Sequence, residues 1–108
     1  NGVNHRLFST GGKEEGKNLV LLGHVDTVFP PGSGSRAYEE SGEIIFGAGI
    51  TDMKAGVAVI VSALGVLDDM TLLGSIAVKC LINGDEEIGS THSQTIIKKL
   101  ASDYELVI

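Results

Sequence analysis

Two nearly continuous apolar runs most constrain the fold of this chain. They are NLVLLG, Asn18 to Gly23, and GSIAVKCLIN, Gly74 to Asn83. Short apolar runs between polar or glycine-rich segments are typical of strands buried on both faces, as in parallel sheets covered by helices on both sides. The core is therefore expected to form around these two strands.

The rest of the chain alternates between helix and strand patterns. Ala55 to Leu67 is rich in valine, but its unbroken apolar length favours a helix. A second helix is predicted from Ser90 or Thr91, as N-cap, to about Leu100, and a strand is predicted over residues 104–108. The order strand, helix, strand, helix, strand predicts an α/β fold with a mostly parallel sheet flanked by helices.

The remaining segments are predicted to be turns, loops and short strands. The pair Gly11-Gly12 is predicted to form a hairpin turn between residues 6–8 and the next strand. Phe29 to Gly42 is predicted to be a loop with an acidic turn in it, because its two prolines prevent a helix from starting there. Glu43 to Phe46 is predicted to be a short strand that leads into a glycine turn.

The apolar helix has almost no polar face before Asp68-Asp69. A helix that is apolar all round is normally covered on more than one side. A chain of 108 residues offers few elements to cover it, so the natural chain is expected to be longer.

Charge and composition exclude some classes of partner. The formal net charge is −6 and Lys98-Lys99 is the largest basic cluster, so a nucleic-acid partner is not expected. The apolar run at residues 55–67 is too short to span a bilayer, so no membrane partner is expected. The lone cysteine, Cys80, is expected to be a buried core thiol, and the default location is cytoplasmic.

Chemically active side chains follow the predicted strands and the glycine turn. His24 and Asp26 come after the first strand, Asp52 lies in GAGITDMKAG, and residues 85–87, Asp-Glu-Glu, come after the second apolar strand. Carboxyl ends of parallel strands meet at one edge of a sheet, so these groups can converge. Imidazole and carboxylates without a thiolate suit zinc, cobalt or manganese.

Each of these groups also has a simpler interpretation when it is taken alone. A His-x-Asp pair arises often by chance, and an acidic triplet is usually a solvated turn. His5 is expected to be a surface histidine, and His92 is not expected to serve as a ligand. A helix that begins near Lys54 would stabilise the charged form of Asp52, which strengthens the metal hypothesis.

Three motifs together carry a family resemblance. GHVDTVFP (Gly23 to Pro30), GAGITDMKAG (Gly47 to Gly56) and NGDEEIGS (Asn83 to Ser90) resemble motifs of the zinc-dependent exopeptidase and deacylase family. That family includes glutamate carboxypeptidase, acetylornithine deacetylase, succinyl-diaminopimelate desuccinylase and aminoacylase. The wording of the first and third motifs looks most like the glutamate carboxypeptidase branch. The resemblance runs from about Asn18 to Ile108.

The resemblance implies a role for each residue of a dinuclear zinc site. His24 would bind one zinc, with Asp26 fixing the tautomer of its ring, and Asp52 would bridge both zincs. Glu87 would bind the second zinc, for which cobalt is a possible substitute. Glu86 would be the general base for hydrolysis of an amide bond next to a free carboxylate. Asp85 is implied only as a structural neighbour. The family also implies a cis peptide after the bridging aspartate.

The resemblance further implies parts that this sequence lacks. A carboxylate shortly after Ile108, a distant histidine and a smaller dimerisation domain are all expected in family members. Residues 1–108 are therefore expected to be the N-terminal part of a catalytic domain and to be inactive alone. The parent protein is expected to be a homodimer that acts on small peptides or N-acyl amino acids.

Two other functions stay open from the sequence. One is a binding or regulatory module of the same fold without catalysis, which would lack the carboxylate and the histidine expected after Ile108. The other is a plain α/β domain whose acidic loops are solvated turns. In that case His24 would lie far from Asp52.

Overall fold

The computed structural model describes residues 3–12, 18–30, 32–33, 38–104 and 106–108. Its main sheet has four strands in the order β1-β5-β2-β6. These strands are β1 (Arg6–Ser9), β2 (Asn18–His24), β5 (Ala77–Asn83) and β6 (Leu106–Val107). Strands β3 (Glu39–Ser41) and β4 (Ile44–Phe46) form a separate antiparallel hairpin.

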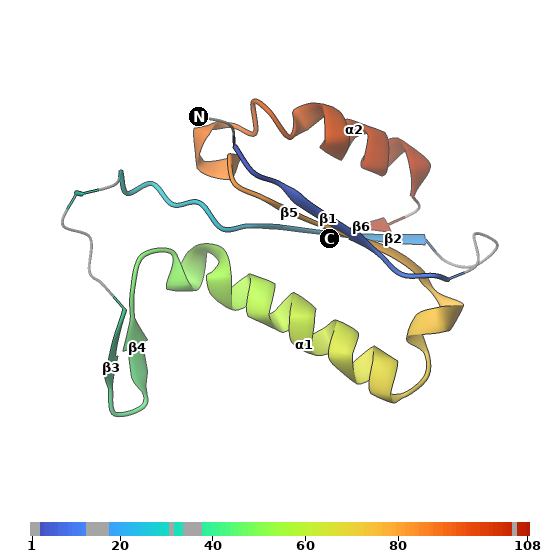
Figure 1. The fold of residues 1–108 in the computed structure, drawn as a ribbon, viewed down its shortest axis with the longest axis horizontal. Coiled ribbons are helices and arrows are strands. Elements are labelled where there is room, and N and C mark those ends of the chain that lie inside the picture. The colour runs from blue at the N-terminus through green and yellow to red at the C-terminus, as the bar shows by residue number, and fades with distance from the viewer. Residues whose placement is uncertain (1–2, 13–17, 31, 34–37, 105) are drawn as a thin grey trace.

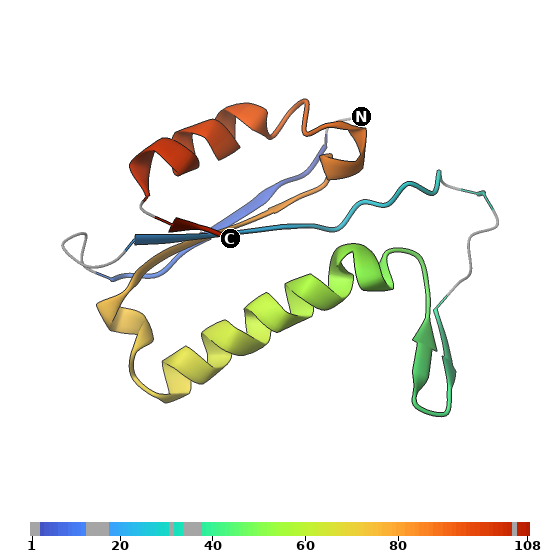
Figure 2. The same cartoon turned by 180° about the vertical axis from the view of Figure 1, so that it is seen from behind.

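Two helices cover the sheet from opposite sides. Figures 1 and 2 show α1 (Ala55–Asp69) on one face and α2 (Gln94–Asp103) on the other, with the β3–β4 hairpin projecting beyond the start of α1. Three short helical turns join these elements: η1 (Ile50–Lys54), η2 (Leu73–Ser75) and η3 (Glu86–Ile88). The α/β fold predicted from the sequence is therefore confirmed.

The sheet is mixed, with the parallel strands at its centre. β2 runs parallel to both β5 and β6, whereas β1 is antiparallel to β5. The prediction that Gly11-Gly12 joins β1 to the next strand in a hairpin is wrong, because β1 pairs with β5 over residues 79–82. A strand that carries no patterned apolar face gives no signal of a partner so distant in sequence.

The hydrophobic core lies between the central strands and α2. Its buried members are Val20 of β2, Leu81 of β5 and Leu100 of α2. Ile96 and Ile97, also of α2, are partly buried and pack against them. The core therefore packs α2 against the two central strands, β2 and β5.

One stripe of α1 faces the sheet. The partly buried positions of α1 are 56, 57, 60, 64 and 67, which have the spacing of a single helix face. Gly23 of β2 allows this approach, because a Cβ there would lie 3.2 Å from the Cγ2 of Val57. The outer positions Val59, Val61 and Val66 are more than half exposed, so the described residues cover α1 on one side.

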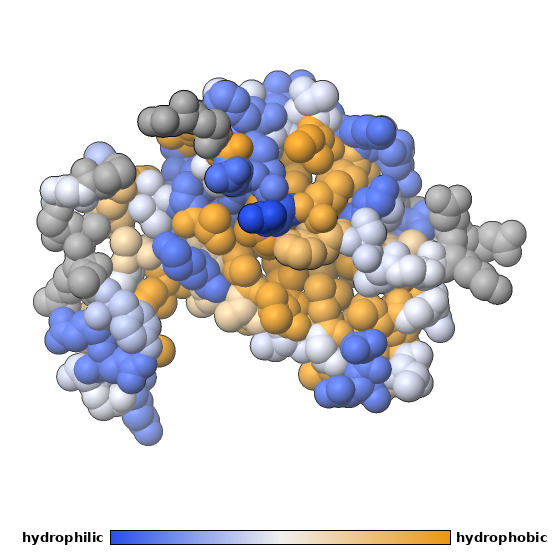
Figure 3. Space-filling view, viewed as in Figure 1, coloured by the Kyte–Doolittle hydropathy of each residue, from blue (hydrophilic) through white to orange (hydrophobic). Residues whose placement is uncertain are grey.

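The stretch Ile50–Asp69 is long and apolar enough to cross a membrane by length and composition alone, a test that core helices of soluble proteins also pass. Its regular part, α1, has 15 residues, so it is about 22 Å long. A typical hydrocarbon core is about 30 Å thick. Figure 3 shows that apolar atoms gather across the middle of the visible face, between the two helices.

Some predicted boundaries differ from the structure. The acidic turn predicted at Glu39-Glu40 is part of strand β3, and β5 begins at Ala77 rather than Gly74. α2 begins at Gln94, with Ser93 as its N-cap, and not at Ser90 or Thr91. The side chain of Ser93 makes no capping hydrogen bond to its own helix, because it is committed elsewhere.

Candidate metal centre

His24 is the last residue of β2 and lies at the carboxyl end of the sheet. In the parallel register it is opposite Asn83, the last residue of β5, so the two strands end together. The side chain of His24 is 5% exposed. Its Nδ1 lies 3.3 Å from the Oδ1 of Asp26 and 3.3 Å from the Asp26 carbonyl oxygen. Asp26 thus holds one ring nitrogen and leaves Nε2 free to face the other side.

Asp52 lies in turn η1, directly before α1. The helical backbone is interrupted there, with extended φ and ψ angles of −122° and 101°, and the Asp52-Met53 peptide bond is cis. The cis bond agrees with what the family resemblance implied. The turn is braced by Lys54, whose Nζ donates a hydrogen bond to the carbonyl of Ala48 at 2.6 Å. Asp52 therefore projects from a turn that is held by a hydrogen bond, and 76% of its side chain is exposed.

Glu86 and Glu87 belong to the single helical turn η3, which follows β5. The N–H of Gly89 donates to the Glu86 carbonyl at 2.8 Å and closes the turn. The backbone N–H of Glu87 donates to the Oδ2 of Asp26 at 3.0 Å. The turn that bears the two glutamates is thereby attached to the segment that follows β2.

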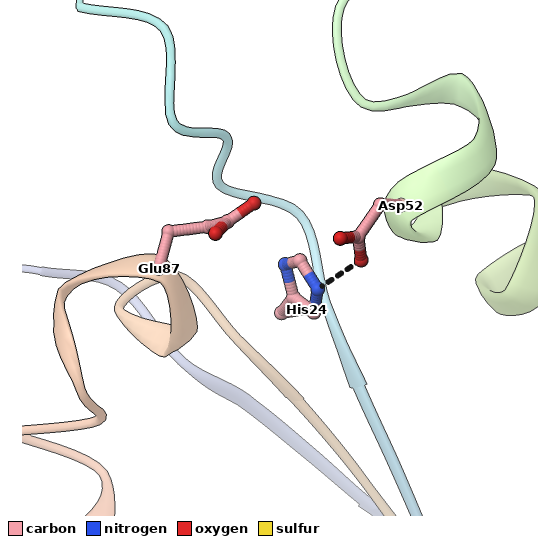
Figure 4. Close-up of side chains that lie close together, drawn as sticks. All are labelled: His24, Asp52 and Glu87. Atoms are coloured by element: carbon pink, nitrogen blue, oxygen red, sulfur yellow. Dashed lines mark hydrogen bonds and ion pairs between the residues drawn. The ribbon is translucent and has the colours of Figure 1, made fainter.

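The three residues predicted to bind metal come together. One ligand atom each from His24, Asp52 and Glu87 lies within 4.8 Å of the others. Figure 4 shows the three side chains reaching toward a common space from the end of β2, from η1 and from η3. His24 Nε2 lies 3.0 Å from Asp52 Oδ1 and 3.9 Å from Glu86 Oε2. His92, which was not expected to be a ligand, is outside this group.

The site places an imidazole among carboxylates. Burial lowers the pKa of His24, but its hydrogen bond with Asp52 and the charges of Glu86 and Asp26 act in the opposite direction and prevail. The pKa of His24 is therefore raised above its ordinary value of 6.5. A metal-binding imidazole must be neutral, so protons and cations compete for Nε2.

Asp52 stands between two cavities. One, of about 450 Å³, is lined by His24, Glu86 and apolar residues of both central strands. The other, of about 250 Å³, is lined by Glu87, residues 27–29 and the glycine turn before η1. The carboxylate at the shared wall can thus meet a ligand from either side.

A buried aspartate lies beside the site, at the position that the family resemblance implied to be a structural neighbour. Asp85 is fully buried and accepts hydrogen bonds from the backbone N–H groups of His92 and Ser93 and from the Ser93 hydroxyl. Burial alone raises the pKa of Asp85, but these three bonds outweigh it and hold the pKa below 3.8. In the sequence, the buried role of Asp85 is indicated only by a serine, Ser93, that follows the two glutamates at a distance from which it could bond to the aspartate.

The side chain of His5 is mostly buried and lies beside Asp85. Its Nδ1 is 3.8 Å from the Oδ1 of Asp85, and its side chain is 14% exposed. The expectation of a surface histidine is therefore wrong. The pairing of β1 with β5 explains the position, because Arg6 lies opposite Ile82 and His5 therefore lies near the end of β5.

Comparison with known proteins identifies a family that matches most of the chain. The model of the peptidase family M20/M25/M40 matches residues 20–108. Carboxypeptidase G2 of Pseudomonas sp. (strain RS-16) is 38% identical over 94 residues, which cover 84% of this chain and 23% of that protein. Succinyl-diaminopimelate desuccinylase of Gluconobacter oxydans (strain 621H) is 42% identical over 95 residues, which cover 82% of this chain and 24% of that protein.

A solved structure has the same fold. The crystal structure of human carnosine dipeptidase 1 matches 95% of this chain and 24% of its own, with a TM-score of 0.73 and 21% sequence identity. The chain thus spans about a quarter of the length of the relatives it matches. With its fold, its converging site and a family model that matches most of its residues, the chain belongs to the peptidase family M20/M25/M40.

Proposed function

We propose that this chain carries half of the active site of a zinc-dependent hydrolase that cleaves an amide bond next to a free carboxylate. The observation that carries the proposal is the convergence of His24, Asp52 and Glu87 within 4.8 Å, at the sheet edge of a chain in this family. The names of its relatives support substrates such as small peptides or N-acyl amino acids.

The donor set suits zinc. Imidazole and carboxylate ligands without thiolate are typical of catalytic zinc and cobalt sites. Ligand atoms about 2 Å from one zinc ion are roughly 3 Å apart, and His24 Nε2 and Asp52 Oδ1 are 3.0 Å apart. One oxygen of the exposed Asp52 carboxylate lies 3.0 Å from His24 Nε2, and Asp52 has a ligand atom within 4.8 Å of one from Glu87, which supports a site for two cations with Asp52 as the shared ligand.

We assign each residue a role from its contacts. His24 would bind one cation through Nε2, because Asp26 occupies the side of the ring that bears Nδ1. Glu87 would bind the second cation. Glu86, whose carboxylate is 54% exposed beside His24, would take a proton from the attacking water and pass it to the leaving amine. A bound zinc ion supplies Lewis-acid polarisation and lowers the pKa of water.

The complete active site would require chain outside this sequence. Three ligands from this chain are fewer than two zinc ions require, because each catalytic zinc normally has three protein ligands. We therefore propose that residues 1–108 are the N-terminal part of a longer catalytic domain and are inactive alone. We further propose a cytoplasmic, homodimeric parent protein.

The test uses the complete protein that carries this chain, prepared free of metal. N-acyl amino acids and dipeptides are supplied with zinc, cobalt or magnesium, and release of the free amino acid is followed. The proposal expects turnover with zinc or cobalt and its loss in Glu86→Gln. Turnover that persists with a chelator present would contradict the metal assignment.

A further inference from the structure

The carboxylate of Asp85 is held at both oxygens. Oδ2 accepts the backbone N–H groups of His92 and Ser93 at 2.6 and 3.0 Å. Oδ1 accepts the Ser93 hydroxyl at 2.6 Å and the side-chain amide of Asn83 at 3.4 Å. A fully buried carboxylate with this many donors is strongly fixed in place, because each bond to a charged group is stronger than one between neutral groups.

These bonds close a loop at its base. Asn83 ends β5 and Ser93 caps α2, and the amide of Asn83 also donates to the Ser93 hydroxyl oxygen at 3.0 Å. The N–H of Ser90 donates to the backbone carbonyl of Asp85 at 2.6 Å. These hydrogen bonds therefore hold the two ends of the loop between β5 and α2 close together.

Glu86 and Glu87 are carried by this closed loop. Among the described residues, neither glutamate carboxylate has a hydrogen bond of its own, and the nearest ionic contact is the 3.9 Å approach of Glu86 to His24. Their direction is therefore set by the backbone of η3. That backbone is anchored at its base by Asp85 and at its tip by the Glu87 N–H bond to Asp26.

We propose that Asp85 is a positioning residue, which holds the glutamate turn so that Glu86 and Glu87 face His24. The expected effect of Asp85 on catalysis rests on the proposed function. The expected effect on the order of residues 84–93 does not depend on that function. The base of the loop is buried, so without Asp85 its donors would have no partner and the loop would have to move.

The experiment compares two variants of the complete parent protein, Asp85→Asn and the milder Ser93→Ala, with the wild type. Hydrogen exchange of the metal-free protein reports order in residues 84–93, and a cobalt titration followed by visible absorbance reports affinity. Steady-state kinetics with zinc supply kcat and KM. Exposed Asp103, at the far end of α2, provides the charge-matched control Asp103→Asn.

We expect Asp85→Asn to speed exchange in this segment, to weaken cobalt binding and to lower kcat about 10-fold or more, with KM almost unchanged. Ser93→Ala should show the same pattern with smaller changes, because it removes one of the donors. Asp103→Asn should match the wild type. If Asp85→Asn lowers the melting temperature but leaves kcat and cobalt affinity per folded molecule unchanged, the residue is merely structural and the proposal is overturned.

The two proposals can fail separately. If the wild-type protein hydrolyses none of the substrates, the proposed function fails, and Asp85 is judged on exchange and cobalt affinity alone. Faster exchange with weaker cobalt binding would then sustain the positioning role. If both readouts stay at their wild-type values, the role is refuted, whatever the activity.

Discussion

The carboxylate of Asp26 accepts the backbone N–H of Glu87 at 3.0 Å, although the two residues are 61 positions apart in the sequence. Its other oxygen lies 3.3 Å from Nδ1 of His24. One side chain therefore links the histidine at the end of β2 with the glutamate turn after β5. A mutation at this position should disturb both halves of the site.

Replacement of Asp26 by asparagine should weaken cobalt binding by about 10- to 100-fold, because partners that orient ligands have effects of this size. An amide can present only one oxygen, so either the charged oxygen 3.3 Å from the histidine or the acceptor of the Glu87 N–H is lost. Visible absorbance during a cobalt titration measures the affinity. Asp69→Asn, at the exposed end of α1, is the control, and an equal effect there would refute the link.

Removal of the imidazole at position 24 should abolish tight cobalt binding. The chain offers a matched control in His92, whose exposed side chain lies outside the ligand group. His24→Ala is expected to lose affinity by at least about 10-fold, and His92→Ala to keep it. Calorimetry with cobalt on the metal-free parent protein and on the two variants measures these affinities. If the two variants lose affinity to the same extent, His24 is not the ligand.

Substitutions of Glu86 and Glu87 should have different effects, one on kcat and the other on metal affinity. Glu86→Gln is expected to lower kcat by about 10²- to 10⁴-fold, the usual contribution of a general base, with metal affinity retained. Glu87→Gln is expected to weaken metal binding first and to recover part of its activity at high zinc concentration. Metal titration and steady-state kinetics on both variants provide the measurement. Exchanged phenotypes would mean that the two roles are reversed.

Asp85 should make the protein sensitive to acid. Its folded pKa lies below the ordinary value of 3.8, so the unfolded chain binds the proton more readily. The stabilisation is complete above pH 3.8 and is lost as the pH falls below it, toward the folded pKa. Denaturant unfolding at a series of pH values should show wild type and Asp85→Asn converging in acid. A constant difference at every pH would contradict this.

The outer face of α1 should promote self-association of the isolated chain. Val59 is 67% exposed and Ser62 is exposed on the same helix. Val59→Lys and Ser62→Lys each bring the net charge of −6 closer to zero, so charge alone cannot separate them. Sedimentation velocity should show more monomer for Val59→Lys than for Ser62→Lys. Equal distributions would show that this apolar surface does not drive association.

The central strands and the main site could be predicted from the sequence because burial leaves a local signature. A strand covered on both faces must be apolar throughout, as Val20 and Leu81 illustrate. Parallel strands that end at one edge then bring His24 and Glu87 together by geometry alone. The glycine turn similarly predicted where Asp52 would emerge.

The errors concern interactions between distant residues. Nothing local in β1 indicates that Leu7 pairs with Leu81, so its partner strand was missed. N-cap preferences suggested Ser90 or Thr91, because capping rules consider only the residues next to a helix. The hydroxyl of Ser93 is instead directed to Asp85, a contact that exists only after β5 and α2 have packed together.

The adjacency of β2 and β5 has a consequence for how this chain acquires its chemistry during synthesis. The strands are neighbours in the sheet, yet the whole of α1 and the β3–β4 hairpin are translated between them. Until residues 77–83 have left the ribosome, His24 has no opposite strand and the β2 edge stays unpaired. Assembly of the proposed metal site should therefore be a late event on the ribosome, in step with completion of the core.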